Sequence, residues 1–100
     1  MTTLNCAENQ ISSSLTLSNK PLLSYVNVSN NKLTSLAFSS INTKLFTLDC
    51  SNNLLNSLTF TTAQSSLNEL RCNNNGLTTI DTSKLTQLKT LDCSNTQIVT

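Results

Sequence analysis

Charged and aromatic residues are scarce in this chain. Only 11 of its 100 residues are Asp, Glu, Lys or Arg, and the formal net charge is +1 with no cluster of basic side chains. The aromatic residues are Tyr25, Phe38, Phe46 and Phe60. Proteins that bind nucleic acid neutralise its phosphates with clustered Lys and Arg. The composition therefore excludes nucleic acid as an expected partner.

Long apolar runs are absent as well. No stretch approaches the roughly 18 consecutive apolar residues that a membrane-spanning helix requires. The first 20 residues also lack the basic start and the apolar stretch of a signal peptide. Ser, Thr and Asn supply 46 residues, so neutral polar groups provide most of the solvation. We expect no membrane insertion, and a secreted or cell-surface protein whose export signal has been removed.

A tripeptide recurs at a fixed period. Its five copies begin at residues 4, 26, 48, 70 and 91, at intervals of 22, 22, 22 and 21. The copies are Leu4-Asn5-Cys6, Val26-Asn27-Val28, Leu48-Asp49-Cys50, Leu70-Arg71-Cys72 and Leu91-Asp92-Cys93. Five positions after each start stand Asn9, Asn31, Asn53, Asn75 and Thr96, and seven positions after it stand Ile11, Leu33, Leu55, Leu77 and Ile98. With Leu23, Leu45, Leu67 and Leu88 before the later copies, the unit reads L-x-x-L-x-C-x-x-N-x-L, which predicts a single repeat array over 1–100, as a segment of a longer array.

Alternation within the tripeptide is typical of a strand with one buried face. The first and third residues are expected to point inward and the middle residue outward. Each asparagine falls where the chain must turn out of the strand, and its amide can satisfy backbone groups there. Stacked copies of Asn9, Asn31, Asn53 and Asn75 would form an asparagine ladder. The patterns Leu33-x-x-Leu36-x-Phe38 and Leu55-x-x-Leu58-x-Phe60, and a weaker Leu77-x-x-Ile80-x-Thr82, predict a second inward set that closes each coil.

These residues resemble the leucine-rich repeat family. The segment from Gly76 to Ile98, GLTTIDTSKLTQLKTLDCSNTQI, is most similar to the cysteine-containing repeats of bacterial internalin-type surface proteins. The resemblance covers the whole chain and implies an α/β-type leucine-rich repeat solenoid. Such a solenoid has a concave parallel sheet of about five strands, and a convex side of short strands or 3₁₀ turns with little or no helix. The resemblance also implies adhesion or ligand capture at a cell surface.

The cysteines share one position of the repeat. Cys6, Cys50, Cys72 and Cys93 are third in their tripeptides, and Val28 fills that position in the second copy. An even number of cysteines in an exported chain ordinarily suggests disulfides. Side chains on strands about 4.8 Å apart point in parallel, however, whereas a disulfide needs them directed at each other. We expect a buried ladder of free thiols, and no metal site, because the chain has neither histidine nor a C-x-x-C pair.

Catalysis requires a nucleophile beside a base, or two carboxylates that converge on one point. The chain has no histidine, and its carboxylates are Glu8, Asp49, Glu69, Asp81 and Asp92. Only Asp49, Glu69 and Asp92 share the outward side of the predicted strands. Arg71 stands between the two aspartates in that column, which favours a surface ion-pair stripe over an active site. We therefore expect no enzymatic activity and no cofactor.

The outward strand positions define a candidate binding face. They are Thr3, Asn5, Ala7, Tyr25, Asn27, Ser29, Thr47, Asp49, Ser51, Glu69, Arg71, Asn73, Thr90, Asp92 and Ser94. The candidate ligand contacts among them are Tyr25, Asn27, Thr47, Asp49, Glu69, Arg71, Asn73 and Asp92. Tyr25 and Arg71 come first because Tyr and Arg are enriched among the residues that anchor interfaces. An ordinary solvated sheet face is the alternative, and Asn27-Val28-Ser29 also matches a glycosylation acceptor.

Two functions from different classes follow from the repeat. The first is an extracellular module whose concave face binds a protein or, as a weaker possibility, a glycan. The second is a structural subunit whose terminal coils stack end to end into a filament, since uncapped coils leave unpaired backbone and apolar positions. An ice-binding solenoid is disfavoured, because the outward columns mix Thr, Tyr and Glu rather than repeating Thr in register.

Overall fold

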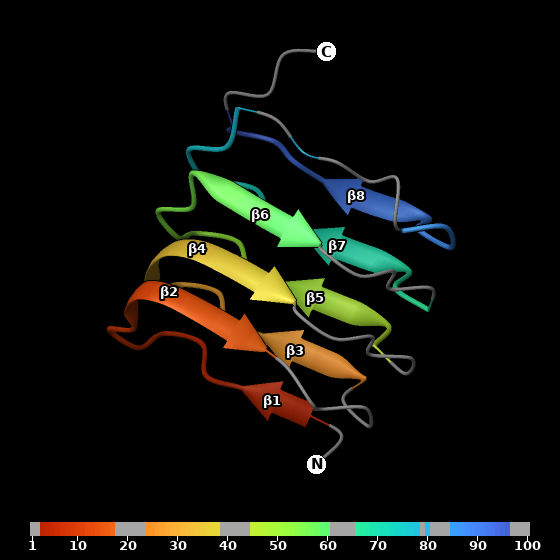
Figure 1. Cartoon of the computed structure of the whole chain (residues 1–100), viewed down its shortest axis with the longest axis horizontal. Coiled ribbons are helices and arrows are strands. Elements are labelled where there is room, and N and C mark those ends of the chain that lie inside the picture. The colour runs from red at the N-terminus through yellow and green to blue at the C-terminus, as the bar shows by residue number, and fades with distance from the viewer. Residues whose placement is uncertain are drawn as a thin grey trace.

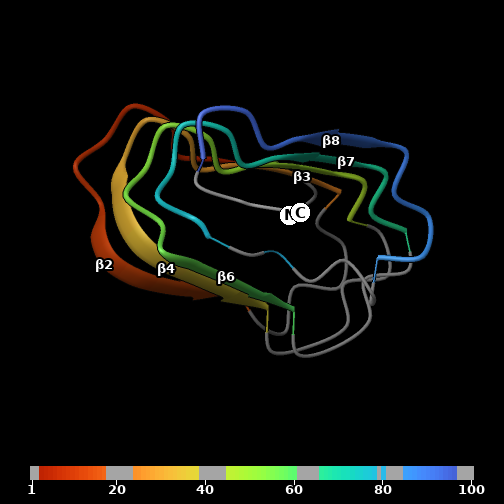
Figure 2. The ribbon, with the colours of Figure 1, turned by 90° about the horizontal axis from the view of Figure 1, so that it is seen from above.

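The computed structural model describes residues 3–17, 24–38, 45–60, 66–78, 80 and 85–96. Its strands form two parallel sheets (Figure 1). The five-stranded sheet has the order β1 (Thr3–Asn5), β3 (Tyr25–Asn27), β5 (Thr47–Asp49), β7 (Glu69–Arg71) and β8 (Thr90–Asp92). The three-stranded sheet has the order β2 (Ser12–Leu17), β4 (Lys32–Phe38) and β6 (Ser57–Phe60). Seen from above, the two sheets lie on opposite sides of the stacked coils (Figure 2).

This arrangement confirms the fold class that the repeat predicts. The parallel sheet has five strands, one for each tripeptide, and the described residues contain no helix. On the opposite side of the first three coils the described residues form strands, and β4 with seven residues is longer than any strand of the five-stranded sheet. The described part of the chain also has no helix that could cross a membrane.

The apolar first residues of the tripeptides lie in register across the five-stranded sheet. Leu4 pairs with Val26, and the pairing continues through Leu48 and Leu70 to Leu91. Val26, Leu48 and Leu70 are fully buried, whereas Leu4 is half-buried and Leu91 is 40% exposed. An inner coil is covered from both sides and an outer coil from one side. The best-sealed part of the core therefore lies in the three middle coils.

The second inward set closes these coils as expected. Leu33, Leu36, Leu55 and Leu58 are buried: the first two lie in β4, Leu58 lies in β6, and Leu55 lies just before β6. The pairing of β2 with β4 shifts by one residue after Ser13, so that β4 contains a bulge. The side chains of Phe38 and Phe60, and the whole of Leu23, Asp81, Thr82 and Ile98, lie outside the described residues.

The fourth connection differs from the expected pattern. Leu77 is fully buried, as in the preceding coils, and Ile80 is half-buried. Leu85, which the repeat unit does not include, is only 4% exposed, whereas Leu88 at the expected leucine position is half-buried. The amide of Leu88 donates to the carbonyl of Leu85 over 3.2 Å. This connection is one residue shorter than the others, and the resulting turn brings Leu85 into the core.

A left-handed residue follows each strand of the five-stranded sheet. Asn30, Asn52, Asn74 and Asn95 have φ between 53° and 58°, and Glu8 at the same position of the first coil has φ 59°. Asparagine tolerates this region because its short polar side chain bonds locally, whereas most other side chains are strained there. Glu8 is therefore the one residue of this column whose type does not suit its backbone.

Replacing Glu8 with asparagine is expected to stabilise the chain by roughly 0.5 to 1 kcal/mol, because the left-handed conformation costs asparagine less. The free energy of unfolding in urea would measure the gain. Glu8→Ala is the control, since it removes the charge but keeps a residue that disfavours positive φ. An equal gain in both variants would mean that charge, not backbone strain, sets the effect.

Candidate binding face

The outward residues of the five-stranded sheet form three columns, which together we call the outer face. The first column contains Thr3, Tyr25, Thr47, Glu69 and Thr90, and the second contains Asn5, Asn27, Asp49, Arg71 and Asp92. The third follows the strands and contains Ala7, Ser29, Ser51, Asn73 and Ser94. All eight candidate ligand contacts therefore lie on one side of the molecule, on the four neighbouring strands β3, β5, β7 and β8 or, for Asn73, directly after one of them.

The third column is less accessible than the sequence predicts. Ser29 and Ser51 are 5% and 7% exposed, so they are not part of an accessible surface. Each serine donates hydrogen bonds to the side chain of the middle residue of its own tripeptide. The Oδ1 of Asn27 accepts the backbone N–H of Ser29 at 3.0 Å and its hydroxyl at 2.6 Å. The expectation that these serines face solvent is wrong, because they are held by the residue two positions earlier.

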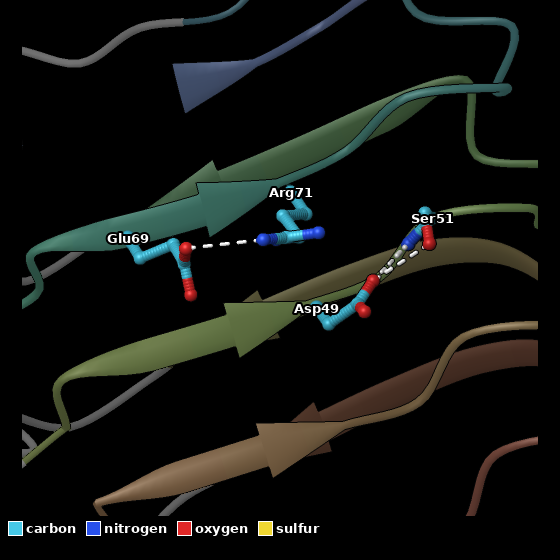
Figure 3. Close-up of polar contacts among 4 residues, drawn as sticks. All are labelled: Asp49, Ser51, Glu69 and Arg71. Carbon is cyan, nitrogen blue, oxygen red and sulfur yellow. Dashed lines mark hydrogen bonds and ion pairs between the residues drawn. The ribbon is translucent and has the colours of Figure 1, made fainter. Parts of the chain in front are cut away.

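The same contact recurs in other coils. The Oδ1 of Asp49 accepts the N–H and hydroxyl of Ser51 at 3.1 and 2.6 Å (Figure 3). Asp92 accepts those of Ser94 at 3.1 and 2.8 Å. An Asx side chain that bonds the backbone two residues on fixes a turn. Asp49 and Asp92 thus fix the turns that follow β5 and β8, while their side chains remain on the outer face.

The two donors of Ser94 lower the pKa of Asp92, and the positive charge of Arg71 adds to that effect. A carboxylate that accepts hydrogen bonds stays ionised to lower pH, because the bonds favour its charged form. Asp92 therefore carries its negative charge on the outer face at neutral pH.

Arg71 makes its ion pair within its own strand. Its Nη2 lies 3.3 Å from Oε2 of Glu69, and Figure 3 shows the two side chains side by side on β7. The hydrogen bond and charge of Glu69 raise the pKa of Arg71, with smaller contributions from Asp49 and Asp92. The ion pair of Arg71 is thus made with Glu69 on its own strand, and the aspartates of the neighbouring strands act on Arg71 through their charge. At 52% exposure, the Arg71 side chain remains accessible.

Tyr25 is the other large side chain of the outer face. It is 37% exposed, and its hydroxyl accepts a long contact of 3.4 Å from Nδ2 of Asn27. The first column around it contains the short side chains of Thr3 and Thr47. The outer face thus presents one tyrosine and one arginine above a surface of small polar groups.

The ladder asparagines bond to two coils at once. Nδ2 of Asn53 donates to the carbonyls of Val28, Cys50 and Ser51 at 3.0 to 3.1 Å. Its Oδ1 accepts the N–H of Leu33 at 3.1 Å. Asn31 and Asn75 make the equivalent four bonds, again to two neighbouring coils. All three side chains are buried.

The first and last coils have weaker versions of this contact. Asn9 is exposed and donates to the carbonyls of Cys6 and Ala7 in its own turn. Thr96 donates its hydroxyl to the carbonyl of Cys93 at 2.6 Å. An amide has two donors and an acceptor, whereas a hydroxyl has one donor. The bonds between coils are therefore most complete at the middle of the stack.

All four cysteines are free, but their burial differs along the stack. Cys50 and Cys72 are fully buried, whereas Cys6 and Cys93 are half-buried. The Cys50 thiol donates to the carbonyl of Arg71 at 3.3 Å. Burial raises the pKa of Cys50 well above its usual value and that of Cys72 to about 11. Cys6 and Cys93 are less buried than the sequence predicts, because each lies in an outer coil.

The raised thiol pKa values predict a loss of stability in alkali. The folded chain favours the neutral thiol of Cys72. The buried thiol therefore adds its full share to the free energy of unfolding below the unfolded pKa near 9.0. That share falls as the pH rises towards about 11. Denaturant midpoints across this range would measure the loss. Cys50→Val/Cys72→Val should flatten the profile, since Val28 fills the same position fully buried. An unchanged slope in the double variant would assign the loss to other groups.

Within the described ranges, no group of three metal-ligating side chains gathers at one point. Among those residues, Glu69 pairs with Arg71, and Asp49 accepts hydrogen bonds from Ser51. What the outer face offers is shape, hydrogen-bonding groups and charge.

One segment of the chain matches a known protein family. Residues 65–100 match the family described as leucine-rich repeats in two copies, a segment that contains β7 and β8. No curated protein and no solved structure matches the chain. Leucine-rich repeats are typically non-enzymatic modules that mediate protein–protein interaction. The match covers 36 of the 100 residues, and the two parallel sheets of the described residues are consistent with it.

Proposed function

We propose that this chain is an extracellular protein-binding module that uses the outer face for adhesion or ligand capture. The observation that carries the proposal is the exposure of Tyr25 and Arg71 above short polar side chains. Tyrosine and arginine combine apolar area with directed hydrogen bonds, which is why they dominate the energetics of many interfaces. A protein ligand is favoured over a glycan, because the face has a single aromatic residue. The composition, rich in neutral polar side chains, supports a place outside the cell.

The charge of the face narrows the choice of ligand. Asp49, Glu69 and Asp92 surround the single guanidinium of Arg71, so the second and first columns carry more negative than positive charge. A protein ligand with exposed Lys or Arg opposite the aspartates would complement this face, and such complementarity raises the association rate and its sensitivity to salt.

The proposal is tested by screening the chain against purified extracellular protein domains. Tyr25→Ala/Arg71→Ala should raise the Kd of a specific ligand by roughly tenfold or more, as for other anchor residues. Lys32→Ala is the matched control, since Lys32 is an exposed residue of β4 on the opposite sheet. A ligand that tolerates the double variant but is lost with Lys32→Ala would contradict the proposal. Denaturant midpoints would show that all variants are folded.

End-to-end assembly is the second candidate, favoured by the edges of the described sheet. β1 and β8 are the edge strands of the five-stranded sheet, and Leu91 on β8 is 40% exposed. Half-buried Leu4 and Cys6 at one edge, and Cys93 at the other, repeat each other's spacing. A head-to-tail contact of this kind does not close on itself and extends into a filament.

Sedimentation of the chain over a wide concentration range distinguishes the two candidates. A filament subunit should grow in size with concentration, and Leu91→Asp should return it to monomer by placing a charge at the contact. A well-folded monomer at high concentration would contradict the filament and leave the binding module as the function.

A further inference from the structure

Gly76 is the only glycine of the chain, and the fold does not require it. The equivalent residues of the preceding coils are Gln10, Lys32 and Leu54. Lys32, Leu54 and Gly76 all donate their backbone N–H to the coil before, at 2.7 to 2.8 Å. Gly76 has no positive φ, and a Cβ built on it would lie 3.4 Å from the carbonyl oxygen of Leu55, an ordinary contact. Backbone conformation therefore does not require a glycine at this position.

Gly76 follows Asn75, and no other asparagine in the chain precedes a glycine. The backbone nitrogen after an asparagine can lose its proton and attack the side-chain Cγ, which forms a five-membered imide and expels the amide nitrogen as ammonia. Water then opens the imide to aspartate or isoaspartate. A side chain on the following residue hinders the attack, so glycine makes it fastest. We propose that Asn75–Gly76 is a deamidation site that the folded chain protects and that opening of the fourth coil exposes.

Protection follows from the hydrogen bonds of the two residues. Nδ2 of Asn75 donates to the carbonyls of Cys50, Cys72 and Asn73 at 3.1 to 3.2 Å, and its Oδ1 accepts the N–H of Leu55 at 3.0 Å. The N–H of Gly76 donates to the carbonyl of Leu55 at 2.8 Å. The attacking nitrogen is thus bonded and held in place, and the Asn75 side chain is only 8% exposed. The reaction requires these bonds to break first.

The product cannot rebuild the contact. A carboxylate accepts hydrogen bonds but cannot donate them, so aspartate at position 75 would face the carbonyls of Cys50, Cys72 and Asn73 without an N–H. Isoaspartate would in addition lengthen the backbone within the turn. Deamidation therefore destabilises the closed fourth coil, and the loss is permanent because the ammonia has left. Asn31 and Asn53 have the same bonds but are followed by Lys32 and Leu54, whose side chains slow the attack.

The test uses the full chain, incubated at mildly alkaline pH either folded or unfolded in denaturant, with peptide mapping by mass spectrometry. In the unfolded chain Asn75 should deamidate faster than Asn31 and Asn53. In the folded chain its rate should fall by about a hundredfold, as for a site that reacts only after local opening. Equal rates in the two states, or equal rates at the three asparagines when unfolded, would overturn the proposal.

Gly76→Ala supplies the matched control. It keeps Asn75 and all its hydrogen bonds, and the space for the added Cβ is available. In denaturant the variant should lower the Asn75 rate to that of Asn31 and Asn53. A second measurement follows the product: the deamidated fraction, isolated and returned to native buffer, should show a lower denaturant midpoint than the unmodified chain. An unchanged midpoint would contradict the claim that deamidation destabilises the closed coil.

Discussion

Asn53→Ala is expected to lower the free energy of unfolding by about 1 to 3 kcal/mol, the usual cost of leaving a buried polar group unsatisfied. Alanine removes the acceptor of the Leu33 N–H, which is buried between the second and third coils. It also removes one of the donors to the carbonyls of Val28 and Cys50. A urea titration followed by circular dichroism would give the change.

Asn9→Ala is the control for this substitution. Asn9 has the same position in the repeat, but it is exposed and bonds only within its own turn. Water can replace its bonds, so the loss should be less than half of that for Asn53→Ala. Equal losses in the two variants would show that the asparagines act through their own turns and not by joining coils.

Leu70→Ala should be more damaging, with a loss of about 2 to 5 kcal/mol, because it removes a fully buried side chain from the middle of the stack. Leu70 lies between Leu48 and Leu91 in the register of the five-stranded sheet. The substitution leaves a cavity between the coils on either side. These coils cannot close the cavity, because β7 is paired with both β5 and β8.

Leu91→Ala changes the same position of the next coil, where the leucine is 40% exposed. Less apolar area returns to water and no closed cavity forms, so its cost should be less than half as large. If Leu70→Ala proves too unstable to purify, Leu70→Val gives a milder change for the same comparison. Similar costs at positions 70 and 91 would contradict the graded burial along the stack.

The repeat predicts most of the fold because one spacing controls both strand pairing and burial. Leu48 and Leu70 stand 22 residues apart in sequence, and they pair in the sheet. The same spacing relates Asn53 to Asn75, whose side chains make equivalent bonds. Position in the repeat determines which backbone groups a side chain contacts. Those contacts can therefore be predicted from the sequence.

The local geometry of the outer face was harder to predict. Ser51 was expected to face solvent, but alternation beyond the end of a strand no longer holds, and Asp49 draws the serine inward. A signal for this contact was present, since Asx followed two residues later by Ser recurs at Asn27, Asp49 and Asp92. The left-handed column has a similar signal, because Asn30, Asn52 and Asn74 recur every 22 residues just before the ladder.

The partner of Arg71 could not be predicted from register alone. Register places Arg71 between Asp49 and Asp92, but its ion-pair partner is Glu69, two residues earlier on the same strand. Leu85 was missed for another reason, since it lies in the connection whose length departs from the period. Sequence periodicity cannot predict which residues are buried in a connection whose length departs from the repeat.

The rate of thiol labelling at each cysteine tests most directly whether the coils stack with a sealed interior. In native buffer Cys50 and Cys72 should label far more slowly than Cys6 and Cys93, since they are fully buried and their pKa values are raised. In denaturant all four should label at similar rates. Fast labelling of Cys50 and Cys72 in the native chain, or four equal native rates, would contradict the stacked solenoid.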